Sequence, residues 1–169
     1  LKDPCALFRM ATAHGYRHLG LPVDPTKCIE LLRESADLGF PEAQHRLGAC
    51  YHTGDMGLVE QNEAEAIKWW EKAAEGGDIL AWHNLGCTEY DNGDVVAAMR
   101  HLRLSASGGS KRSMGALIGC FENGFLHHAD LAETLQVFYR SRDEMRSKER
   151  VLCVVQLKTT GEHEENMDL

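Results

Sequence analysis

The chain has 169 residues, of which 43% are apolar and 26% charged, a composition typical of one globular domain with a buried core. Acidic side chains outnumber basic ones by 26 to 18, and the resulting net charge of -8 argues against nucleic-acid binding and against attachment to anionic membranes. No apolar run reaches the ~20 residues needed to cross a bilayer, and the first residues show no signal-peptide pattern.

The six cysteines lie at positions 5, 28, 50, 87, 120 and 153 and include no Cys-x-x-Cys pair. An even number allows disulfides, but helical hairpins do not need them, so we expect mostly packed thiols in a reducing compartment. The predicted location is intracellular, in the cytoplasm. Since the chain does not begin with Met, we expect it to be a segment of a larger protein.

The first predicted helical hairpin covers residues 3–39. Asp24 followed by Pro25 predicts the start of its second helix, because Asp accepts hydrogen bonds from first-turn amides and proline suits the first helical position. Gly39 is expected to end that helix, and Pro41 to begin the next one.

The second hairpin, residues 41–77, has the clearest pattern. Its first helix carries an apolar stripe at i, i+4 and i+8, formed by Ala43, Leu47 and Tyr51. Its second helix is predicted to start at Asn62, which has capping-box spacing to Glu65. The apolar face of that helix is formed by Ala66, Trp69 or Trp70, and Ala73.

Two weaker hairpins follow, at residues 79–109 and 111–150. The last helix is expected to start near Asp130 and to continue to Arg150 or beyond. Residues 151–169 form a predicted C-terminal extension with a disordered, acidic end. Its apolar segment 151–155 allows either an extension of the last helix or packing back onto it.

The motifs of these hairpins recur. His45, Leu47 and Gly48 return 38 residues later as His83, Leu85 and Gly86, and the segment Ala74–Gly77 returns as Ala106–Gly109. A repeat period in the thirties predicts stacked helical hairpins, so we expect an all-α, right-handed α-solenoid of about four antiparallel helix-turn-helix repeats. The expected anchors of the repeats are Ala43, Leu47, Gly48, Tyr51, Trp69, Trp70, Ala74, Gly77, Ala81, Leu85, Gly86, Ala106 and Gly109.

These motifs resemble the Sel-1-like repeat family, a relative of the tetratricopeptide repeats. The resemblance covers roughly residues 3–150 and is strongest over residues 43–77. It implies an α-solenoid adaptor whose inner surface binds peptides or proteins, without catalytic residues. The block 143–150 also looks like the close of repeat arrays in a subgroup of algal proteins, some of which carry a zinc-binding module elsewhere.

A helical wheel identifies candidate binding residues. His45, Ala49 and His52 lie on the stripe opposite Leu47, and the equivalent places in the third hairpin are those of His83, Cys87 and Tyr90. Of these residues, His45, His52, His83 and Tyr90 are the candidates for contact with a partner. This stripe faces the concave surface of helical-hairpin arrays, and imidazole and phenol groups suit hydrogen bonds to a partner. The alternative is that these four are surface residues without a partner.

The predicted function is a protein–protein interaction scaffold that binds a protein or peptide, with no catalysis, cofactor or metal of its own. Nucleophile-elbow, phosphate-loop and His-Glu-x-x-His motifs are absent from the sequence. One alternative is the substrate-recruiting repeat arm of a larger ubiquitin ligase or zinc-module protein. A second is a hydrolase or metal-dependent enzyme, for which His127, His128 and Asp130 have metal-like residue types.

Overall fold

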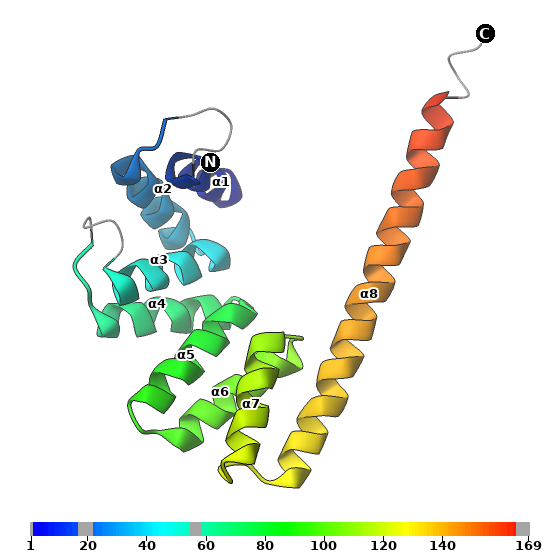
Figure 1. The fold of residues 1–169 in the computed structure, drawn as a ribbon. Helices are drawn as coiled ribbons and strands as arrows, with labels where there is room; N and C mark the ends of the chain where they lie inside the picture. Colours follow the sequence, from blue (N-terminus) through cyan, green and yellow to red (C-terminus); the bar gives the residue numbers. More distant parts are fainter. Residues whose placement is uncertain (1, 17–21, 55–58, 165–169) are drawn as a thin grey trace. The chain divides into compact units, whose positions relative to one another are not determined.

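The computed structural model describes residues 2–16, 22–54 and 59–164, and within these ranges the chain forms eight helices and no strand. Figure 1 shows α1 to α6 following one another as paired helices. The helices are α1 Pro4–Tyr16, α2 Pro25–Asp37, α3 Pro41–Thr53, α4 Glu63–Glu75, α5 Ile79–Asp91, α6 Val95–Ser107, α7 Lys111–Glu122 and α8 His128–Glu164. The chain divides into two compact units, residues 1–105 and 106–169.

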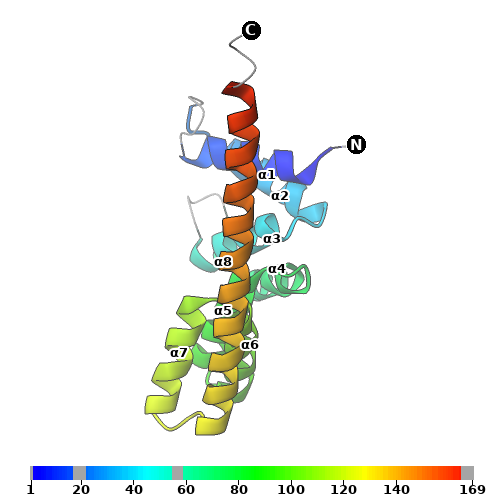
Figure 2. The ribbon, with the colours of Figure 1, turned by 90° about the vertical axis from the view of Figure 1, so that its right-hand side faces the viewer.

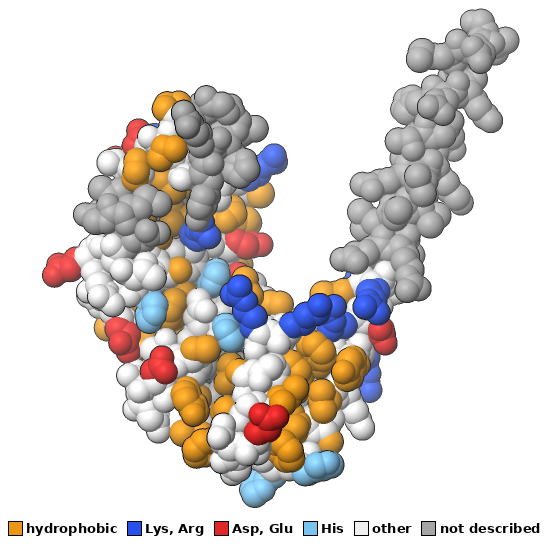
Figure 3. Space-filling view, in the orientation of Figure 1, with side chains coloured by type: hydrophobic (Ala, Val, Ile, Leu, Met, Phe, Trp, Pro, Cys, Tyr) orange, Lys and Arg blue, Asp and Glu red, His pale blue; other side chains and the backbone are white. Residues whose placement is uncertain are grey.

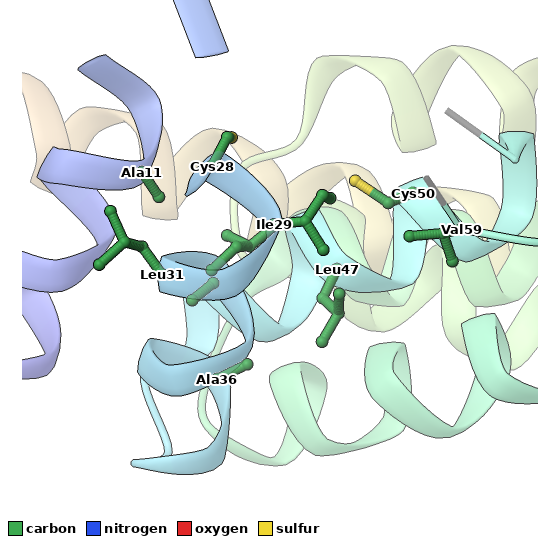
Figure 4. Close-up of a cluster of buried hydrophobic side chains, with 10 residues drawn as sticks. Ala11, Cys28, Ile29, Leu31, Ala36, Leu47, Cys50 and Val59 are labelled. Atoms are coloured by element: carbon green, nitrogen blue, oxygen red, sulfur yellow. The ribbon is translucent and has the colours of Figure 1, made fainter. Parts of the chain in front are cut away.

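In the first unit, helices pack both within and between hairpins. α1 packs against α2 and α3 against α4, while α2–α3 and α4–α5 contacts join each hairpin to the next. A continuous set of buried side chains joins the first hairpin to the second, and Figure 4 shows Ile29 of α2 beside Leu47 of α3. Each hairpin therefore completes its core with its neighbour, as expected of helical repeats.

The helix starts that the sequence predicted at Asp24 and Asn62 are confirmed. The Asp24 carboxylate accepts a hydrogen bond from the Lys27 amide at 2.9 Å, and the Asn62 side chain accepts one from the Glu65 amide at 3.1 Å. These bonds satisfy first-turn amides that have no partner inside the helix.

The start of the last helix is corrected. α8 begins at His128, and the His127 carbonyl accepts a hydrogen bond from the Leu131 amide. Asp130 therefore lies inside the first turn, where its negative charge interacts favourably with the positive end of the helix dipole.

α8 runs without interruption for 37 residues, as Figure 2 shows. The apolar segment 151–155 extends this helix, which decides between the two possibilities that the sequence left open. In the second unit α8 packs against α7. The predicted disordered tail began at residue 159, but residues 159–164 belong to α8. Residues 165–169 lie outside the described residues.

Two glycines show why the repeats need this residue. A Cβ at Gly48 would stand 2.6 Å from the indole of Trp70, so the bare backbone lets α4 approach α3. Gly77, which follows α4, has a φ of 93°, a left-handed conformation that side chains other than glycine rarely adopt.

No helix in the described ranges combines the length and the apolar character required to span a bilayer.

Candidate functional site

A pocket of about 150 Å³ opens on the first unit between α3, α4 and α5. Figure 3 shows histidine side chains gathered over the region of these helices. The pocket is lined by Ala49, His52, Thr53, Trp70, Asn84, Cys87, Thr88 and Asp91. Because α3 and α5 are the first helices of neighbouring hairpins, the pocket is built by the repeat itself.

Trp70 forms the floor of the pocket. Only 3% of this residue is exposed, and its indole Nε1 donates a hydrogen bond to the His45 carbonyl at 3.1 Å. The His52 ring lies against the indole, with ring centroids 5.3 Å apart and planes inclined by 48°. The buried tryptophan therefore positions both a wall of the pocket and the backbone behind it.

His45 links the two hairpins behind the pocket. Its Nε2 lies 3.1 Å from the side-chain nitrogen of Asn84, and this contact joins α3 to a pocket residue of α5. Burial lowers the pKa of His45 because it disfavours the charged imidazolium, and the nearby Asp78 carboxylate acts in the opposite direction. His45 is thus half-buried and engaged within the protein.

The other candidate residues lie in different settings. His52 is exposed and lines the pocket, whereas Tyr90 is 42% exposed and is not among the lining residues. His83 is half-buried, and its Nε2 lies 3.7 Å from the Sγ atom of Cys87, one turn further along α5. The structure therefore brings His52 into the pocket and places His45 directly behind it.

On α5 the pocket shares Cys87 with the stripe predicted from the sequence, while its other lining residues lie one position further along the chain than that stripe. The lining residues Asn84, Cys87, Thr88 and Asp91 follow the spacing i, i+3, i+4 and i+7. A helical wheel can find this stripe, but only if the direction of the neighbouring helix is known. Trp70 was predicted as a repeat anchor; that it also forms the pocket floor was missed.

The predicted repeat anchors of the first unit lie mostly in its interior. Ala43, Leu47, Trp70, Ala74, Ala81 and Leu85 are all buried. Trp69 is half-buried, and the Lys72 ammonium lies 4.2 Å from the centre of its ring. One indole thus packs in the core, while the other is partly covered by a lysine side chain.

The pocket suits one side chain better than a cofactor. Its volume is about 150 Å³, and sites for small molecules usually measure about 300–1,000 Å³. Throughout the described ranges, no three His, Cys, Asp or Glu side chains are arranged to hold a metal ion. His127 and His128, the residues with metal-like types, are exposed at the start of α8.

Two consecutive segments, residues 6–40 and 41–78, match the family model of the Sel1 repeat. Residues 6–40 and 41–78 are therefore similar to Sel1 repeats. The second segment supplies α3 and α4, and with them half of the residues that line the pocket. Proteins with Sel1 repeats are typically scaffolds for protein interactions.

Two solved structures share the fold. A Sel1 repeat protein from Oxalobacter formigenes is 26% identical with a TM-score of 0.70, over 82% of this chain and 58% of that one. The protein c5321, a protective antigen of uropathogenic Escherichia coli strains with an SLR fold, is 26% identical with a TM-score of 0.67, over 83% of this chain and 30% of that one. These likenesses confirm the predicted all-α solenoid of helical hairpins.

A curated relative is chitin synthase regulatory factor 2 of Schizosaccharomyces pombe, which is 32% identical over 107 residues. The match covers 60% of this chain and 20% of that protein, so the chain spans about a fifth of its length.

Proposed function

We propose that this chain is a non-catalytic scaffold that binds an extended peptide segment of a partner protein across α3, α4 and α5. The pocket carries the proposal, because it is open to solvent, is formed by helices of two successive hairpins and has the size of one side chain. A peptide that crosses these helices could insert a side chain between them. His52 and Cys87 would contact it directly, and Tyr90 would contact it beyond the pocket on α5.

His45 and His83 have an indirect role in this proposal. Each is half-buried and engaged with a pocket residue, His45 with Asn84 and His83 with Cys87. They would hold the pocket walls in place for the peptide. This pre-organisation reduces the ordering cost of binding.

The relative from fission yeast supports a regulatory setting rather than a catalytic one. Its name describes a regulatory factor, and it is 32% identical to this chain over 107 residues. Adaptors act in this way, by holding another protein through a rigid surface.

The proposal is tested by selecting peptides from a phage-displayed library of random linear sequences on the full chain. We expect enriched peptides whose binding, measured by calorimetry, is lost in Cys87→Trp, because the indole would fill the pocket. Cys5→Trp is the matched control, since Cys5 is an exposed thiol on α1.

Circular dichroism checks that both variants remain folded. His52→Ala is a milder variant, because it removes the imidazole ring from the pocket lining without adding bulk. Failure to enrich any peptide would refute the scaffold proposal. Equal binding by Cys87→Trp and the original chain would move the site away from this pocket.

A further inference from the structure

We infer that the pocket between α3, α4 and α5 takes a basic side chain, lysine or arginine, from the bound peptide. This inference rests on the proposed function and names the chemistry of its partner. Four observations carry it: the apolar and polar residues that line the pocket, the carboxylate at its edge, the helix ends that face it, and the excess of acidic residues in the segment around it.

The walls of the pocket match an amphipathic side chain. The lining combines the apolar Ala49 and Trp70 with residues that carry polar groups, and these polar residues are Thr53, Asn84, Thr88 and Asp91. Lysine and arginine have an apolar stem that packs on hydrocarbon and a charged end that stays near water. The stem would lie against the indole side, and the cation would reach Asp91.

The charge at the edge of the pocket is negative. Asp91 is exposed, and the lining residues within the described ranges include no lysine or arginine. A second carboxylate lies close by, because Glu63 accepts a hydrogen bond at 2.8 Å from the side chain of Asn92, the residue that follows Asp91. A cation in the pocket would therefore meet the Asp91 carboxylate, with the Glu63 carboxylate nearby but outside the lining residues.

The helix ends at the pocket also favour a cation. Thr53 is the last residue of α3 and Asp91 the last residue of α5, so both helices direct their negative dipole ends toward the pocket. The positive end of α4 lies at Glu63, where Glu63 and Glu65 in the first turn oppose it. The Thr88 carbonyl is already bonded to the Asn92 amide, so Asp91 is the group that would bind the cation directly.

The sequence around the pocket adds further negative charge. Residues 41–91 contain ten acidic side chains and three basic ones. Lys68 is paired with Glu65 at 3.2 Å, and Lys72 lies over the Trp69 ring. An acidic surface attracts basic peptides from a distance and speeds their association.

The same phage-displayed library tests the inference at about pH 7.5, where histidine is mostly neutral in its ordinary state. We expect enriched peptides to share one lysine or arginine. Its replacement by alanine should abolish most of the binding, whereas norleucine, which keeps the apolar stem, should weaken binding about as much as Asp91→Asn. Asp91→Asn should weaken binding by about two- to five-fold, the range for an exposed ion pair. Asp37→Asn removes an exposed carboxylate at the end of α2 and should leave binding unchanged.

The outcomes separate the two proposals. Enriched peptides without a shared basic residue, or peptides that bind Asp91→Asn as well as the original chain, would overturn the inference while leaving the scaffold intact. If the library gives no enrichment at all, the scaffold proposal itself fails.

A second measurement needs no peptide. Cys87 lines the pocket, and with Cys5 and Cys153 changed to serine it is the exposed thiol among the remaining described cysteines. We expect a cationic methanethiosulfonate reagent to modify Cys87 faster than an anionic one of similar size, and Asp91→Asn to reduce this preference. Equal rates for the two reagents would contradict a negative potential in the pocket.

Discussion

At the scale of single residues, the pocket depends on the pairing of a glycine with a tryptophan. Gly48 has no side chain, so the Trp70 indole lies against the α3 backbone and donates its hydrogen bond to the His45 carbonyl. His52 then packs on the same indole. The small residue and the large one therefore position the floor and one wall of the pocket together.

Gly48→Ala should destabilise the protein by about 1–3 kcal/mol, the usual cost of overpacking a core. The new Cβ would lie 2.6 Å from the rigid indole and 3.0 Å from the Ala66 carbonyl, so helices must shift. The free energy of unfolding, measured by urea denaturation, checks this expectation.

Gly115→Ala is the control for this change. Gly115 lies inside α7, and a Cβ there would meet nothing within 4 Å. Alanine should therefore stabilise the helix by roughly 0.5–1 kcal/mol. A neutral or stabilising effect of Gly48→Ala would show that the close approach of α3 and α4 is not needed.

At the scale of elements, the joint between the second and third hairpins contains a titratable group. His45 of α3 meets Asn84 of α5, and Asp78, the cap of α5, lies near enough to influence its charge. The packing of one hairpin on the next is therefore coupled to pH.

We expect acid to weaken the protein through His45. Burial lowers its folded-state pKa below the ordinary 6.5. The unfolded chain therefore binds more protons, and the free energy of unfolding decreases as the pH is lowered. The loss begins near the unfolded value and is complete below the lowered folded-state pKa. Urea denaturation at about pH 7.5 and about pH 5.5 should show a smaller difference for His45→Gln than for the original chain.

Asp78→Asn is a second test of how His45 makes stability depend on pH. Asparagine can still cap α5, but it removes the charge that raises the pKa of His45. The loss of stability on acidification should therefore grow. If His45→Gln and the original chain lose equal stability, His45 does not carry the effect.

At the scale of the whole molecule, the chain is modular. Within the unit of residues 1–105, each hairpin contacts the next through α2–α3 and α4–α5, and every residue that lines the pocket lies in this unit. In repeat proteins stability is approximately a sum over units and their interfaces, so a part that contains a complete site can act without the rest.

A fragment of residues 1–109, which keeps all of α6 and the glycines after it, should remain helical and bind the selected peptides as the full chain does. Circular dichroism and calorimetry measure the two properties. A folded fragment that no longer binds would show that residues after 109 contribute to the site.

Much of the fold was predictable because its determinants are local or repeated. At Asp24 and at Asn62, the capping side chain accepts a hydrogen bond from the amide three residues later in the chain. The Leu-Gly motif recurs at a fixed spacing. Periodicity and capping are properties of the chain itself, so they indicate helices and hairpins without knowledge of contacts. The start of α8 was misplaced because an acidic residue suits both a cap and a first turn.

The binding site was predictable only in part. Histidine and tyrosine were chosen for their chemistry, and of these His52 reaches the pocket, whereas Asn84, Thr88 and Asp91 gave no signal in the sequence. Their place depends on how far α5 is rotated against α3 and α4, a rotation fixed by the packing of Trp70 and by the His45–Asn84 contact. The repeat sequence alone thus determined that helical hairpins would stack, because that information is local. Only the tertiary structure decided which side chains meet, because a small rotation of one helix changes the face that it presents.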